Sequence, residues 1–228
     1  VFIDVAEQSG LIETIGPAVV RAACKDAMRW RREGAGELFV SVNVSARQLR
    51  SGDFHDQVTA ALAESGLPPR LMHIELTETA VLGDEEQARQ ILSSLRDLGI
   101  KVWLDDFGTG FSGLSHLRRV PVDGVKIDRS FIADVLRDPD DLALTTAIIA
   151  MAHSLGMTVV AEGVEKEGLY DLLCARGCDL AQGYWLGHPM NMHDFMGLVA
   201  EPPALDQLRL ATQTQSTAAR LPETAPNT

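Results

Sequence analysis

The chain has 228 residues with 32 acidic and 20 basic side chains, which gives a formal net charge of −12 at pH 7. Hydrophobic residues make up 46% and charged residues 23%, proportions that suit a globular protein and exclude a disordered one. The surplus of acids argues against DNA or RNA as a partner, because a phosphate backbone requires clustered Lys and Arg. An anionic ligand would need bound cations to offset the acids.

The sequence has no feature of a secreted or membrane-spanning protein. Its most apolar stretch, residues 143–152, is shorter than the ~18–20 residues that cross a bilayer. The start, Val-Phe-Ile-Asp, has no basic flank, so we expect no signal peptide, and it has no Met, so we expect a piece of a longer chain. Cys24, Cys174 and Cys178 form no C-x-x-C motif. Reduced thiols in a cytoplasmic protein are expected, and a metal or disulfide role for Cys174 and Cys178 is the alternative.

Helix-like and strand-like segments alternate along the chain. In chain order we expect helix 15–32, strand 38–44, helix 53–65, strand 71–76, helix 84–98, strand 100–105, strand 124–127, helix 141–155, strand 157–161, helix 166–176 and strand 178–182. The strands are short apolar runs behind turn signals, as in a buried parallel sheet, so the fold class is α/β. The polar stretch 201–228 is expected to be a C-terminal extension, disordered from about residue 214.

Each predicted strand ends in a polar or charged side chain. The six strands contribute Asn43, Glu75, Asp105 with Asp106, Lys126, Glu162 and Gln182. One such residue can be a core group whose hydrogen bonds are satisfied. Because burial of an unpaired carboxylate costs free energy, polar residues at the same end of all six strands are hard to explain in that way. In closed β/α barrels the catalytic groups lie at this end of the strands.

The types of these residues indicate a divalent metal. Carboxylate and amide oxygens suit Mg²⁺ or Mn²⁺ and differ from the Cys/His ligands of structural zinc. Adjacent Asp105 and Asp106 can contact two metals, and metals ~3.5–4 Å apart serve phosphodiester hydrolysis. Lys126 is then a candidate to orient the attacking water or to meet developing phosphate charge.

Taken singly, these residues also have structural interpretations. The alternatives are a strand-end cap for Asn43, exposed ends for Glu75 and Glu78, a turn for Asp105-Asp106, an ion pair of Lys126 with Asp128, and a helix cap for Glu162 and Glu165. Asp-Phe-Gly also occurs in protein kinases, but no glycine-rich ATP loop or His-Arg-Asp loop accompanies it here.

The ordered set of motifs resembles the EAL-domain family of cyclic di-GMP phosphodiesterases. The matching stretches are Phe-Ile-x-x-Ala-Glu (2–7), Ser-Val-Asn-Val-Ser (41–45), Glu-Leu-Thr-Glu (75–78), Asp-Asp-Phe-Gly-Thr-Gly-Phe-Ser (105–112), Val-Lys-Ile-Asp (125–128), Ala-Glu-Gly-Val-Glu (161–165) and Gln-Gly-Tyr (182–184). The resemblance implies a domain over residues 1–200. The Glu-Ala-Leu motif that names the family is absent, and we expect it upstream of Val1.

The resemblance implies a TIM-like (β/α)8 barrel of EAL type, which in this chain is expected to lack its first one or two strands, since such barrels run to ~250 residues. It implies hydrolysis of cyclic di-GMP to linear pGpG with two Mg²⁺ or Mn²⁺ per site. A non-catalytic cyclic di-GMP receptor is the alternative, because receptors of this family usually lose metal-site residues and the upstream Glu is missing here. A homodimer formed through residues 111–117 and an upstream GGDEF or sensor domain are also implied, with a core-packing helix as the alternative for 111–117.

Site residues follow from the resemblance position by position. The metal ligands are Asn43, Glu75, Asp105, Asp106 and Glu162. The catalytic groups are Lys126, Glu162 and Glu165. Gln182 is expected to contact water or substrate, and Glu78 to anchor the loop that begins with Asp105. Trp185, which follows Gln-Gly-Tyr, is a candidate for contact with a guanine base, with packing as the alternative.

Overall fold

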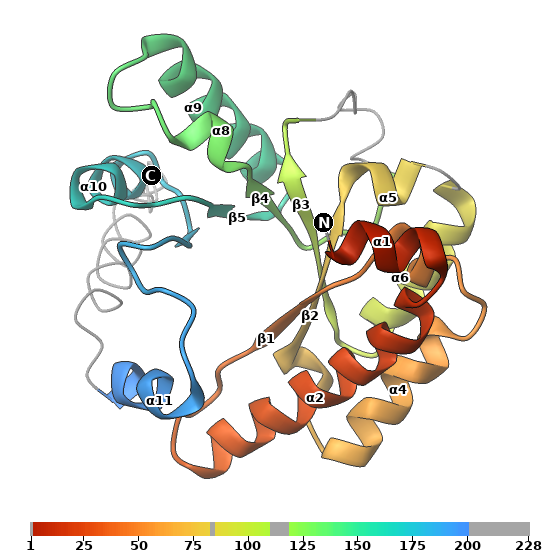
Figure 1. Cartoon of the computed structure of the whole chain (residues 1–228). Helices are drawn as coiled ribbons and strands as arrows, with labels where there is room; N and C mark the ends of the chain where they lie inside the picture. Colours follow the sequence, from red (N-terminus) through yellow and green to blue (C-terminus); the bar gives the residue numbers. More distant parts are fainter. Residues whose placement is uncertain (1, 83–84, 110–118, 201–228) are drawn as a thin grey trace, which may run out of the picture.

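A curled parallel sheet lies at the centre of the computed structural model, which describes residues 2–82, 85–109 and 119–200. Its strands are β1 (Val40–Asn43), β2 (Met72–Thr77), β3 (Lys101–Phe107), β4 (Gly124–Ile127), β5 (Thr158–Ala161) and β6 (Leu180–Ala181). They pair in sequence order, and every pairing is parallel. With its flanking helices the sheet forms part of a TIM-like barrel (Figure 1).

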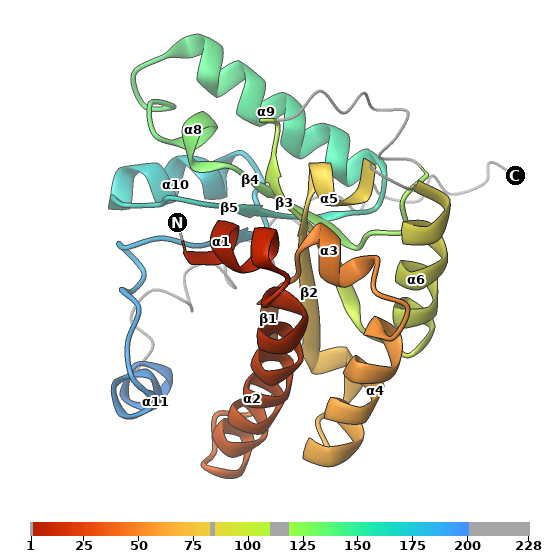
Figure 2. The same ribbon diagram turned by 45° about the vertical axis from the view of Figure 1, so that its right-hand side comes forward.

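The described helices include two that precede β1, and all the others follow strands of the sheet. They are α1 (Phe2–Ser9), α2 (Ile12–Arg32), α3 (Ala46–Leu49), α4 (Phe54–Ser65), α5 (Glu78–Leu82), α6 (Glu85–Asp97), α8 (Arg129–Ile132), α9 (Pro139–Ser154), α10 (Glu167–Ala175) and α11 (Met192–Ala200). A 3-10 turn, η1 (Pro69–Leu71), precedes β2. The short helices α3 and α5 follow the carboxyl ends of β1 and β2 and lie side by side (Figure 2).

Alternation along each strand separates the core from the inner face of the barrel. Ile74, Val102, Val125 and Val159 are fully buried in the core between sheet and helices. Residues two apart on a strand share a face, so the intervening positions face the barrel interior. Trp103 fills that interior below the carboxyl edge, where the absence of a side chain on Gly124 makes room for its ring.

The sequence predicted each described strand and the helices α2, α4, α6, α9 and α10, with shifts of up to three residues. The helix expected at 141–155 begins at Pro139, because the Asp138 side chain accepts the backbone N–H of Asp140 and proline favours the first helical position. The four-residue helices α3 and α8 are too short to show a helical period, and they were not predicted. Neither were α1, α5 and α11.

Two expectations concern residues outside the described ranges, namely the C-terminal extension 201–228 and the segment 111–117. The cysteines are free thiols, and α10 ends between Cys174 and Cys178, so the two do not lie on one helix. None of the described helices combines the length and apolarity that a membrane crossing requires.

Candidate active site

The predicted site residues come together at the carboxyl edge of the sheet. Parallel register places Asn43 beside Glu75 on β1 and β2, and Thr77 of β2 beside Asp105 on β3. Glu162 follows β5, and its N–H donates to the carbonyl of Ile127 at the end of β4 over 3.1 Å. The edge therefore collects side chains from five adjacent strands.

Lys126 is the centre of this cluster. Its side chain projects from β4 and is 4% exposed. The ammonium lies 2.7 Å from Glu75 Oε2, 3.0 Å from Asp105 Oδ1 and 2.5 Å from Glu162 Oε1. Burial alone would lower the pKa of Lys126, but the hydrogen bonds to Glu162 and Glu75 and the charges of Glu75 and Asp105 outweigh it and raise that pKa. The lysine is therefore a permanent cation that holds carboxylates from three strands.

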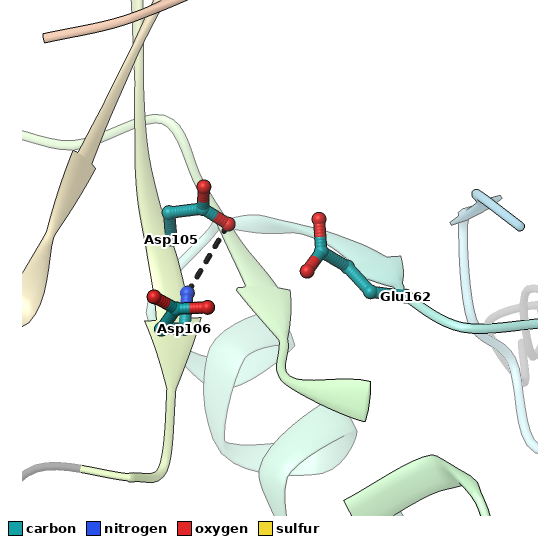
Figure 3. Close-up of side chains that lie close together, drawn as sticks. All are labelled: Asp105, Asp106 and Glu162. Carbon is teal, nitrogen blue, oxygen red and sulfur yellow. Dashed lines mark hydrogen bonds between the residues drawn. The ribbon is translucent and has the colours of Figure 1, made fainter. Parts of the chain in front are cut away.

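Asp105, Asp106 and Glu162 form a second arrangement beside the lysine, in which one carboxylate oxygen of each lies within 4.8 Å of the others (Figure 3). Consecutive residues of a regular strand point to opposite faces. Here the register of β3 with β4 shifts between Leu104 and Phe107, and Asp106 has a φ of 54°, the only positive φ of a non-glycine residue in the described part of the chain. This local irregularity turns both aspartates toward one side of the strand.

The carboxylates at this edge repel one another. Burial, together with the charges of Asp105 and Asp128, raises the pKa of Asp106. Burial likewise raises the pKa of Glu162, as do Asp105 and Glu75, although its hydrogen bond to Lys126 acts in the opposite direction. Because these carboxylates outnumber the single ammonium, the cluster favours additional positive charge. Its oxygen donors suit a hard divalent cation such as Mg²⁺ or Mn²⁺.

Glu78 fixes the chain just beyond the aspartates. It is 6% exposed at the start of α5, and its Oε1 accepts the N–H of Gly108 over 2.8 Å. Its Oε2 is buried and has no hydrogen-bond partner among the described residues. The loop after β3 is thus tied to the element after β2.

The other predicted residues lie around this cluster. Asn43 is exposed on the strand next to Glu75. Glu165 pairs with Arg129, whose Nη2 lies 3.0 Å from Glu165 Oε1, and not with the acids. Gln182 joins the loop after β5 to β6 through its backbone, and it lines a cavity of about 620 Å³ beside α2 and α11 that none of the clustered acids lines.

The structure also decides between several interpretations. Glu75 and Glu78 are buried, not exposed ends. Asp128 caps α8 through the N–H of Ser130, so the ion pair of Lys126 with Asp128 is wrong.

The proposed caps are wrong as well, because the described cap of α3 is Ser45 and the N-terminus of α10 has no side-chain cap hydrogen bond. Trp185 packs on Tyr170 with ring centroids 4.7 Å apart and is half-buried.

Sequence reasoning missed two contacts of the site. The first is the pairing of Arg129 with Glu165, for which the position of Arg129 directly after Val-Lys-Ile-Asp was the available signal. The second is a hydrogen bond below the acid cluster, the floor of the site, in which Trp103 Nε1 donates to His73 Nδ1 over 2.9 Å. Alternation places His73 on the face of Glu75, but no sequence signal indicates that its partner is Trp103.

Comparison with known proteins agrees with this arrangement. Residues 1–189 match the family model of the EAL domain, and the chain belongs to this family. The signalling protein YkoW of Bacillus subtilis is 41% identical over 203 residues, which cover 89% of this chain and 25% of YkoW. The chain thus spans about a quarter of the length of the curated relatives that it matches.

Solved structures show the same fold. The structure titled "PaMucR Phosphodiesterase, c-di-GMP complex" has a TM-score of 0.81 at 38% identity, covering 85% of this chain and 78% of that one. The manganese and cyclic di-GMP complex of Klebsiella pneumoniae BlrP1 has a TM-score of 0.71 at 30% identity, covering 78% of this chain and 45% of that one.

Proposed function

We propose that this chain hydrolyses one phosphodiester bond of cyclic di-GMP to give linear pGpG, with two Mg²⁺ or Mn²⁺ ions as cofactors. The observation that carries the proposal is the cluster of Lys126 with Glu75, Asp105 and Glu162, with Asp106 beside it. The MucR and BlrP1 structures are complexes with cyclic di-GMP, which supports this ligand, and the BlrP1 complex contains manganese, which supports a divalent metal.

The donor set fits the proposed ions. We assign Asn43, Glu75, Asp105, Asp106 and Glu162 as the residues that would hold them, because hard divalent cations bind carboxylate and amide oxygens. Bound divalent ions would polarise the phosphodiester and acidify a water molecule. They would also offset the acidic edge, which otherwise repels an anionic substrate.

The protein's own groups have separate tasks in this proposal. Glu162 accepts a proton from the attacking water, a role for which its raised pKa is suited, since a base is most effective with a pKa near the working pH. The water oxygen bonds to phosphorus, the bond to the ribose oxygen breaks, and that oxygen takes up a proton. Lys126 keeps its charge throughout, so it holds the carboxylates in place and stabilises negative charge that develops on the phosphoryl group.

Three further assignments complete the site. Glu78 holds the loop after Asp106 through Gly108, Glu165 stands beside the water-activating group, and Gln182 contacts water or substrate. Every acid that the family resemblance places within residues 1–228 is present, which favours hydrolysis over the receptor function, because a receptor does not need these acids.

The experiment incubates the full-length natural protein with cyclic di-GMP and either Mg²⁺ or Mn²⁺, and separates the nucleotides by chromatography. Appearance of pGpG is the expected result. Glu162→Gln should reduce turnover by ~10²–10⁴-fold and leave cyclic di-GMP binding, followed by calorimetry, in place. Glu167→Gln, at an exposed glutamate of α10, is the matched control and should keep activity. Binding without turnover by the folded wild type would favour a receptor.

A further inference from the structure

A four-residue helix, α8, lies between the two strand ends that carry the acids. It begins directly after β4, where the Asp128 side chain accepts the N–H of Ser130 over 2.9 Å. Its other end is fixed to α9, because the buried Thr145 hydroxyl donates to the carbonyl of Phe131 over 3.0 Å. In Figure 1, α8 lies beside α9 near the carboxyl ends of β3 and β4. The helix is therefore anchored at both ends.

Phe131 of α8 packs against the loop that follows the aspartates. A Cβ atom on Gly108 would lie 2.7 Å from Cε2 and 3.0 Å from Cζ of the Phe131 ring, so the ring contacts the glycine backbone itself. Gly108 has a φ of 102°, which disfavours any other residue. The same glycine donates its N–H to Glu78. The chain two residues after Asp106 is thus clamped between Glu78 and the Phe131 ring.

Arg129 of α8 makes the equivalent contact with the loop after β5. A Cβ atom on Gly163, which directly follows Glu162, would lie 2.4 Å from Cγ and 2.9 Å from Cβ of Arg129. Gly163 has a φ of 72°. The aliphatic stem of Arg129 therefore covers the Gly163 backbone, while its guanidinium pairs with Glu165 at 3.0 Å. One side chain therefore contacts the loop at Gly163 and again at Glu165.

We propose that α8 is a wedge that sets the width of the metal site, with Phe131 and Arg129 as positioning residues. Phe131 fixes the backbone that carries Asp105 and Asp106, and Arg129 fixes the backbone that carries Glu162. The carboxylates of these two loops repel each other, and the wedge keeps them at a distance that suits divalent cations. The inference rests on the proposed function for the identity of the bound ions.

A positioning role for Arg129 can be distinguished from a role in packing. The Arg129 side chain is 63% exposed, so its removal should cost the fold little. Misplacing a ligand by ~1 Å, in contrast, can cost ~10²-fold in rate, and loss of a group that orients ligands typically costs ~10–100-fold in metal affinity or activity. A positioning role therefore predicts a large effect on metal affinity with a small effect on stability.

The test measures Mn²⁺ affinity of the full-length natural protein by electron paramagnetic resonance, together with kcat and KM for cyclic di-GMP. Phe131→Ala and Arg129→Ala should each weaken Mn²⁺ binding by ~10-fold or more and lower kcat more than they raise KM. Phe131→Leu and Arg129→Lys, which keep bulk or stem and charge, should recover most of the loss. Leu144→Ala and Arg137→Ala, at exposed positions of the same region, are the controls and should behave as wild type.

The outcomes are distinguishable. If Phe131→Ala and Arg129→Ala fold and bind Mn²⁺ as the wild type does, the wedge is wrong. If Phe131→Ala fails to fold, the Mn²⁺ affinities of Arg129→Ala and Phe131→Leu test the wedge proposal in its place. If the wild type binds Mn²⁺ but hydrolyses no cyclic di-GMP, the proposed function is wrong. The Mn²⁺ affinities of the variants relative to the wild type still test whether α8 acts as a wedge. If the wild type binds no Mn²⁺, the wedge proposal is overturned, and formation of pGpG with Mg²⁺ decides the proposed function separately.

Discussion

Lys126→Met removes a buried ammonium from the middle of the acid cluster and keeps the length of the side chain. Three carboxylates, those of Glu75, Asp105 and Glu162, would lose their cation. Since the side chain is 4% exposed, water replaces the lost charge poorly. The variant should therefore be less stable than the wild type, and the destabilisation should be largest when no divalent cation is added.

The magnitude follows from the burial of both partners. Removing one member of a buried ion pair costs ~3–5 kcal/mol. The three carboxylate side chains are 10%, 13% and 18% exposed, so some water reaches them, and we expect the lower end of that range, about 3 kcal/mol. At this chain length such a loss lowers Tm by about 6–12 °C. The matched control is Lys101→Met, because Lys101 is half-exposed and pairs with Asp123 at the opposite end of β3. An exposed pair contributes ~0–1 kcal/mol.

The assay is urea unfolding followed by circular dichroism, with EDTA and then with saturating Mn²⁺. Mn²⁺ should narrow the difference between Lys126→Met and wild type, because a cation bound to the native carboxylates replaces the missing charge. The difference should also shrink as the pH falls. Loss of Lys126 removes the hydrogen bond and the charge that lower the pKa of Glu162, so this pKa rises further above its value in the unfolded chain. Between the unfolded and the native pKa the native state binds more protons than the unfolded state, so acid stabilises the variant. Equal stability of Lys126→Met and Lys101→Met in EDTA would refute the reasoning.

Three further predictions concern the loop, the floor of the site and the metal. Glu78→Ala leaves the Gly108 N–H without its carboxylate, so unfolding free energy should fall by ~1–3 kcal/mol and Mn²⁺ affinity should decrease; wild-type values for both would contradict the anchoring role. Burial, with the nearby charge of Lys101, lowers the pKa of His73 to about 4. The unfolded state takes up a proton near pH 6.5 and the native state does not until about pH 4. The contribution of neutral His73 to the free energy of unfolding is therefore complete above pH 6.5. It should fall by up to about 3 kcal/mol as the pH drops toward about 4. His73→Phe should flatten this part of the pH profile in urea titrations, although it starts from a lower stability because Trp103 loses its acceptor; an unchanged slope would disprove the assignment. EDTA should abolish pGpG formation and added Mn²⁺ or Mg²⁺ should restore it, and full activity after exhaustive chelation would exclude a metal-dependent reaction.

Much of the site could be predicted before the structure because parallel strands place their carboxyl ends at one edge. Glu75, Asp105, Lys126 and Glu162 were grouped on that basis, and their side chains contact one another. The partner of Lys126 could not be predicted in this way. Asp128 is nearer in sequence, yet it caps the helix that begins at the next residue. A short carboxylate beside a helix start satisfies backbone N–H groups first.

The sequence by itself determined the order of the strands and helices, the edge at which the acids lie and the family to which the motifs belong. These features follow from local periodicity, turn residues and ordered motifs, which a linear chain displays directly. Only the tertiary structure decided that Asp105 and Asp106 face the same side, because this depends on a register shift against β4 and on the φ of Asp106. It also decided that Gly108 and Gly163 are each covered by a side chain of α8. Such contacts join residues from different strands, and their existence depends on how the sheet curls.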